Sequence, residues 1–160
     1  MGAAGGCLRF WDSSALLALA AWEVASGKVD LLLQRDPEVA FWWGAPLACL
    51  TALADAKRRE RISGLGFDRG RAVIDHLRAR SYEIQPTSEV RARAARLVSV
   101  HPLKADQALE LAAALLWCKE RTSGAGFVSL DSTLRLAAAL EGFRVLPYAD
   151  EVHEPVEERV

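Results

Sequence analysis

Hydrophobic and polar residues follow two periods along this chain, one typical of strands and one typical of helices. Short apolar runs rich in aromatic and β-branched side chains predict strands at residues 7–11, 38–43, 82–85, 127–130 and 143–146. Longer segments with apolar residues three or four positions apart predict helices at residues 15–26, 30–35, 46–61, 67–80, 88–99, 106–120 and 133–141. Strands that alternate with helices indicate an α/β fold with a mainly parallel sheet.

The alternation contains no internal repeat and no linker, so we expect one domain over residues 1–148, followed by an acidic tail at 149–160. A chain of 160 residues is long enough to bury one sizeable core. Acidic residues interrupt the longest apolar runs, which are therefore too short to span a bilayer. The first residues also lack the basic region of a secretory signal. We expect a soluble cytoplasmic protein.

Charge is distributed unevenly. The formal net charge is -1, yet residues 57–104 contain twelve Lys or Arg and only five Asp or Glu. Such a segment predicts either solvated helix faces or a basic surface for a polyanion such as RNA. The candidates for RNA binding are Arg58, Arg59, Arg69, Arg71, Arg91, Arg93 and Arg96. The three cysteines form no CxxC pair and the three histidines are widely spaced, which argues against a disulfide framework and a zinc site.

Three aspartates stand where side chains from different elements are expected to meet. Asp12 and Asp131 each follow a predicted strand, and Asp106 opens a predicted helix. Ligands of parallel α/β sheets bind beyond the carboxyl ends of the strands. Acids gathered there repel one another unless a cation compensates their charge, and Mg²⁺ and Mn²⁺ prefer oxygen ligands. Each aspartate alone would also serve as a helix cap or turn residue, so the combination is what predicts a metal site.

Four segments of the chain resemble the PIN-domain ribonuclease family, in particular its VapC-type toxins. They are FWDSSALLAL from residue 10, WWGAPLACLTALADAKRRERI from residue 42, HPLKADQALELAAALLWC from residue 101 and GFVSLDSTLRLAAALEGFRVLP from residue 126. The resemblance implies a three-layer α/β/α sandwich with a mainly parallel sheet. It also implies a Mg²⁺- or Mn²⁺-dependent endoribonuclease acting on tRNA, rRNA or mRNA, which forms a homodimer and is neutralised by a cognate antitoxin.

The resemblance assigns catalytic and metal-binding roles to Asp12, Asp106 and Asp131, with Ser13 and Thr51 near the site. Asp106 matches imperfectly, because the family's acid stands immediately before an Ala-Leu pair, where this chain has Gln107. Glu110 lies four residues after Asp106 on the same helix face and is a candidate substitute or helper.

The segment around Ala48 departs further from the family, which has a glutamate at that position. Alanine has no donor atom, so the usual set of four acids is reduced to three. This difference predicts weakened catalysis, whether it is natural or engineered. The alternative is a PIN-like module that binds RNA or a protein partner without catalysis. A doubly wound domain with a phosphoacceptor aspartate ranks last, because the lysine expected near the sheet edge is missing.

Overall fold

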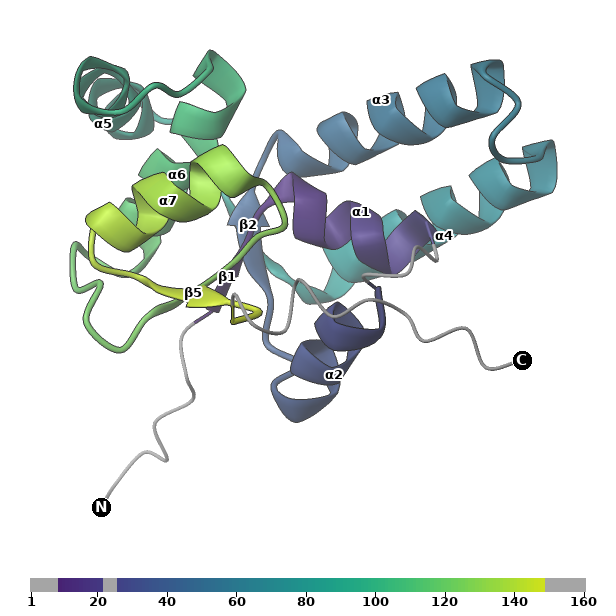
Figure 1. Ribbon diagram of the computed structural model, residues 1–160, viewed down its shortest axis with the longest axis horizontal. Coiled ribbons are helices and arrows are strands. Elements are labelled where there is room, and N and C mark those ends of the chain that lie inside the picture. Colours follow the sequence, from purple (N-terminus) through teal and green to yellow (C-terminus); the bar gives the residue numbers. More distant parts are fainter. Residues whose placement is uncertain (1–8, 22–25, 149–160) are drawn as a thin grey trace.

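The computed structural model describes residues 9–21 and 26–148, which form five short strands and seven helices (Figure 1). The strands are β1 (Arg9–Trp11), β2 (Ala40–Trp42), β3 (Tyr82–Ile84), β4 (Gly126–Val128) and β5 (Arg144–Leu146). The helices are α1 (Ser13–Ala21), α2 (Ser26–Arg35), α3 (Ala45–Arg58), α4 (Gly64–Arg80), α5 (Ser88–Val100), α6 (Ala105–Trp117) and α7 (Ser132–Leu140). The predicted elements are confirmed within the described residues, and β2 to β5 are shorter than predicted. Residues 7–8 of the first predicted strand and residues 22–25 of the first predicted helix lie outside the described residues. The predicted acidic tail at 149–160 lies outside the described residues.

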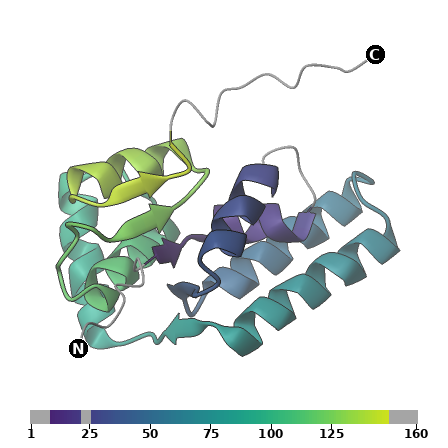
Figure 2. The same ribbon diagram turned by 90° about the horizontal axis from the view of Figure 1, so that it is seen from below.

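All five strands are parallel and lie in the order β3-β2-β1-β4-β5. Right-handed crossovers place helices on opposite faces once the strand order reverses. Accordingly, α1 to α4 lie on one side of the sheet and α5 to α7 on the other (Figures 1 and 2). The predicted α/β fold with a parallel sheet is therefore confirmed. The order reverses between β1 and β4, and the carboxyl ends of these two strands are where a ligand site is expected.

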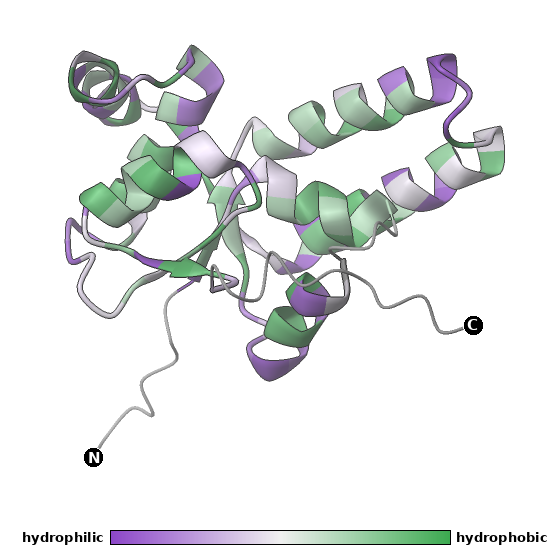
Figure 3. Ribbon diagram, viewed as in Figure 1, coloured by the Kyte–Doolittle hydropathy of each residue, from purple (hydrophilic) through white to green (hydrophobic). Residues whose placement is uncertain are grey.

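Aromatic side chains of the central strands form the core on the α6 side of the sheet. The rings of Phe10 and Phe127 stack with centroids 5.8 Å apart, and Trp117 of α6 lies 6.4 Å from Phe10. Figure 3 shows hydrophobic residues along the strands and α6, and hydrophilic residues at the turn between α3 and α4. In the described part of the chain, none of the helices is long and apolar enough to cross a membrane.

A close contact between α4 and α3 depends on Gly70. A Cβ atom at this position would lie 2.9 and 3.0 Å from the two methyl carbons of buried Leu53 and 3.3 Å from the carbonyl oxygen of Ala20. We expect Gly70→Ala to lower the free energy of unfolding by about 1–3 kcal/mol through overpacking. Gly66→Ala in the same helix is the control, since its Cβ meets only ordinary contacts at 3.4 Å or more. Urea unfolding of both variants tests this, and equal stabilities would contradict it.

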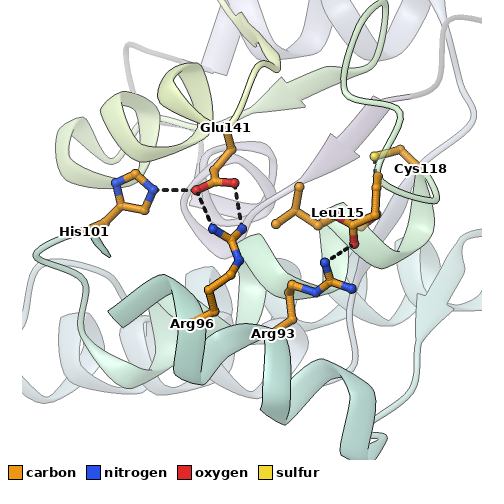
Figure 4. A network of polar contacts seen from close by, with 7 residues as sticks. Arg93, Arg96, His101, Leu115, Cys118 and Glu141 are labelled. Atoms are coloured by element: carbon orange, nitrogen blue, oxygen red, sulfur yellow. Dashed lines mark hydrogen bonds and ion pairs between the residues drawn. The ribbon is translucent and has the colours of Figure 1, made fainter. Parts of the chain in front are cut away.

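Helix α5 is attached to the ends of α6 and α7 by ion pairs (Figure 4). Arg96 donates to Glu141 at 2.7 Å, and the Nε2 atom of His101 lies 2.7 Å from the same carboxylate. Burial would raise the pKa of Glu141, but hydrogen bonds from Arg96 and His101 outweigh burial and hold the pKa below its usual value. Arg93 pairs with Glu120 at 2.7 Å. These contacts fix α5 on the α6 side of the sheet.

Candidate active site

Asp12 is the centre of a hydrogen-bond network at the carboxyl end of β1. Its side chain is buried, and its Oδ1 atom accepts from the Ser14 hydroxyl at 2.6 Å and from the Ala15 N–H at 2.9 Å. Its Oδ2 atom accepts from the Ser129 hydroxyl at 2.5 Å. Burial, although opposed by the hydrogen bonds from Ser129 and Ser14, raises the pKa of Asp12 to about 6.

Glu110, and not Asp106, supplies the buried acid of α6. Both carboxylate oxygens of Glu110 accept from the Ser13 N–H, at 3.2 and 3.3 Å, so this side chain reaches the start of α1 beside Asp12. Burial and then the charge of Asp12 raise the pKa of Glu110 to about 8. The side chain of Asp106 is exposed on the first turn of α6, and its charge also acts on Glu110. The convergence of Asp106 with the other two aspartates stays a prediction, and the structure adds Glu110 as the acid of α6 that lies beside Asp12.

Asp131 follows β4 and caps α7, which agrees with the alternative interpretation of this aspartate as a helix cap. Its Oδ1 atom accepts from the Leu134 N–H at 2.9 Å. Its Oδ2 atom accepts from the Nε2 atom of Gln107 at 2.9 Å, and its charge contributes to the raised pKa of Asp12. Gln107 occupies the position where the family resemblance expects an acid. The structure thus brings Asp12, Glu110 and Asp131 into one electrostatically linked group, on which the charge of Asp106 also acts through Glu110.

The first turns of α3 lie next to this group. The thiol of Cys49 donates to the Ser13 carbonyl at 3.3 Å, and burial together with the charges of Glu110 and Asp12 raises its pKa to about 12. Ala48 is exposed and contributes no polar side-chain atom. The Thr51 hydroxyl donates to the Leu47 carbonyl of its own helix at 2.9 Å, so its hydrogen bond goes to the helix backbone. Ser13 contributes through its backbone rather than its hydroxyl.

Four site residues were not predicted from the sequence: Ser14, Gln107, Ser129 and Arg135. The hydroxyls of Ser14 and Ser129 connect the ends of β1 and β4, because Ser14 accepts from the Leu130 N–H at 2.8 Å while donating to Asp12. The spacing of Ser129 two residues before Asp131 is the one signal that could have indicated its role. Arg135 donates to the carbonyls of Ser129 and Pro147, at 2.7 and 2.6 Å, and joins the ends of β4 and β5.

The carboxylate oxygens of this group are ligands of the type that a hard divalent cation prefers. Asp12, Glu110 and Asp131 form no ion pair with a basic side chain within residues 9–21 and 26–148, and two of them have raised pKa values. Across the same residues, no three His, Cys, Asp or Glu side chains are grouped as metal ligands. Each carboxylate is instead held by protein donors, so binding a cation requires some of these hydrogen bonds to be exchanged.

The predicted RNA-binding arginines fall into two groups. Five of them pair with acids: Arg58 and Arg59 with Asp55, Arg71 with Asp75, Arg93 with Glu120 and Arg96 with Glu141. Arg69 of α4 and Arg91 of α5 are exposed, and the described residues give them no ion pair. RNA binding by these arginines therefore remains a prediction. The side chains of Arg69 and Arg91 are accessible to such a ligand.

Comparison with known proteins identifies the fold. No protein-family model matches the chain, and no curated protein matches it at a significant level. Among solved structures it is similar to PAE2754 from Pyrobaculum aerophilum, with a TM-score of 0.56 and 17% sequence identity over 89% of this chain and 92% of that chain. Together with the five-stranded parallel sheet in the order β3-β2-β1-β4-β5, this similarity shows that the chain has a PIN-like α/β fold.

Proposed function

We propose that this protein is a PIN-type endoribonuclease with a weakened cation site, acting as the toxin of a toxin–antitoxin pair. The single observation that carries the proposal is the group of Asp12, Glu110 and Asp131 at the carboxyl ends of β1 and β4. Two of these acids, Asp12 and Glu110, are buried and form no ion pair among the described residues, although the charge of Asp12 also acts on Arg135. Such an arrangement costs stability unless it serves a ligand of positive charge.

Asp12, Glu110 and Asp131 would hold Mg²⁺ or Mn²⁺. A bound divalent cation supplies two effects, neutralising charge on a phosphodiester and lowering the pKa of a water molecule. Ser14 and Ser129 orient Asp12 through their hydroxyls, so its carboxylate is positioned before RNA arrives. Glu110 keeps a proton on its carboxyl near neutral pH when no cation is present, because it is buried beside Asp12.

The basic segment supports RNA as the substrate class. Arg69 and Arg91 are exposed, and phosphate groups could also compete for the arginines that now pair with acids. Exposed apolar side chains on α3 and α7, Leu47 and Leu140 among them, are available to a protein partner. They support the further proposals of a cognate antitoxin and a homodimer, which come from the resemblance to VapC-type toxins.

An RNA cleavage assay tests the proposed activity. The chain is incubated with labelled tRNA and rRNA fragments in Mn²⁺ or Mg²⁺, with and without chelator. We expect slow cleavage that requires the cation, and Asp12→Asn is expected to reduce its rate by about 100-fold or more, because Asp12 lies at the centre of the acid group. Asp68→Asn on the exposed face of α4 is the matched control and should cleave as the parent does. Equal cleavage by Asp12→Asn would refute the assignment.

A second candidate function is favoured by two specific positions. Ala48 and Gln107 both stand where the family resemblance expects an acid, and the amide of Gln107 holds Asp131 without a cation. These differences support a PIN-like module that binds RNA or a protein and does not cleave. RNA binding that is indifferent to Mn²⁺, with no cleavage in any cation, would support this candidate over the first.

A further inference from the structure

A cavity of about 280 Å³ lies at the carboxyl end of β2, between the start of α5 and helix α6. Its lining combines an aromatic ring and aliphatic side chains with hydroxyl groups and a cation. The residues that line it include Trp42, Pro86, Thr87, Ser88, Arg91 and Leu109. The volume is near the lower end of the range for small-molecule sites, so it suits a single nucleotide-sized group.

The pairing of β1 with β2 places this cavity on the same face of the sheet as the acid group. Phe10 of β1 pairs with Ala40 of β2, and its ring lies on the α6 side. Because side chains alternate along a strand, Asp12 and Trp42, each two residues further on, face that side as well. Helix α6 contributes to both places, with Leu109 in the cavity and Glu110 in the acid group. A strand of RNA at the acid group therefore has the cavity beside it.

The charge of the cavity favours an anion. Among the described residues that line it, Arg91 is the only charged one, and it is exposed and forms no ion pair in that part of the chain. The acid of the first turn of α5, Glu89, lines a different cavity with Arg93 and Arg96. The exposed hydroxyl of Ser88, the first residue of α5, adds a further donor. A guanidinium and a hydroxyl beside an apolar surface match the phosphate and the base of a nucleotide.

We infer that this cavity binds one unpaired nucleotide of single-stranded RNA, with its base against the apolar lining and a phosphate against Arg91 and Ser88. The inference rests on the proposal that RNA is the substrate, and it adds where a nucleotide next to the acid group is held. It requires no bound cation. Only an unstacked base can enter such a cavity, so loops and single strands are favoured over duplex RNA.

Binding of a labelled single-stranded hexaribonucleotide to the full chain in chelator tests the inference without cleavage. We expect Arg91→Ala to bind about tenfold more weakly than the parent, because it loses a charge-assisted contact to phosphate. The slope of log affinity against log salt concentration should fall in magnitude by about 0.7, the value for one phosphate contact. Arg80→Ala is the matched control and should bind as the parent does. Arg80 is also exposed and without an ion pair among the described residues, but it precedes β3 at the opposite edge of the sheet.

A second variant tests the cavity with less risk to the fold. Ser88→Glu places a carboxylate at the start of α5, where an acid stabilises the helix while it repels phosphate. We expect about tenfold weaker RNA binding. Ser99→Glu adds the same charge at the exposed last turn of α5 and should have little effect on binding. A hexamer of abasic nucleotides should bind the parent about tenfold more weakly than the intact hexamer, because contacts with the bases are lost.

Circular dichroism of each variant confirms that it is folded. Equal RNA affinity of the parent, Arg91→Ala and Ser88→Glu would overturn the cavity as a binding site and leave RNA as the substrate class. Equal affinity for the intact and abasic hexamers would overturn the role of the base. If uridine 5′-monophosphate binds as tightly as the hexamer, the cavity holds a free nucleotide and its assignment to RNA is overturned. Absence of RNA binding by the parent would overturn the inference together with the proposed RNA substrate.

Discussion

The Ala48→Glu variant is expected to cleave structured RNA about 100-fold faster than the parent chain, in a reaction that chelator abolishes. A carboxylate at position 48 restores the fourth acid that the family resemblance expects, and misplacement or loss of a catalytic group commonly costs a factor of this size. The thiol of the next residue, Cys49, contacts the Ser13 carbonyl, so this turn of α3 lies beside the acid group. Ala48 itself is exposed, and a longer side chain there needs no space in the core.

Thermal unfolding provides the accompanying control. Without a cation, Ala48→Glu should be as stable as the parent or slightly less stable, because a further acid adds repulsion. Added Mn²⁺ should then raise the melting temperature of Ala48→Glu more than that of the parent. A variant that binds Mn²⁺ yet cleaves none of the tRNA or rRNA fragments would rule out a disabled enzyme and favour the binding module.

Replacing Glu110 by glutamine is expected to stabilise the cation-free protein at alkaline pH. Burial and the charge of Asp12 raise the pKa of Glu110 from 4.5 to about 8, so the folded state holds a proton that the unfolded state releases. The stability of the parent therefore falls as the pH rises from about 4.5 to about 8, and the full penalty remains at higher pH. We expect Glu110→Gln to remove about 3–5 kcal/mol of this penalty at pH 9, and little at pH 4.

Urea unfolding in chelator at both pH values measures this difference. Glu141→Gln is a control of opposite sign, because Arg96 and His101 lower the pKa of Glu141 and thereby stabilise its charged form. That stabilisation is present above the unfolded pKa and is lost as the pH falls through the folded one, so Glu141→Gln should destabilise at neutral pH. Equal stability of Glu110→Gln and the parent at pH 9 would contradict a buried, uncompensated Glu110.

The sequence pattern predicts the fold well because local periodicity decides both the element type and the burial of each face. Strands such as β1 and β4 are too short to show alternation, but their aromatic content and the aspartate that follows each of them mark their ends. The positions of Asp12 and Asp131 at the sheet edge follow directly from these ends. Features that depend only on residues close together in the sequence, such as the ends of these strands, are thus predictable.

The choice of the buried acid in α6 could not be predicted from the sequence pattern. Helix α6 begins at Ala105, one residue before Asp106, which leaves Asp106 on an exposed first turn while Glu110 one turn later faces Ser13. A shift of one residue rotates a helical side chain by about 100°, and the helix start depends on how Gln107 meets Lys104 and Asp131. The contacts of Gln107 with Asp131 and of Glu110 with Ser13 join residues that are 24 and 97 positions apart, so spacing within the α6 segment alone does not determine which acid is buried.

The first strand of the chain is also the middle strand of the sheet, so synthesis releases β1 long before its neighbour β4 exists. Until then, the side chain of Asp12 lacks the hydroxyl of Ser129, which is 117 residues away. Closing a loop of this length costs conformational entropy, and only contacts that form late in folding offset this cost. Dependence on such long-range contacts slows folding. Strands β1, β2 and β3 can assemble first with α1 to α4, leaving one edge of β1 open. During this interval the nascent chain presents an unpaired strand edge and an incomplete acid group, and both are closed together when β4 docks.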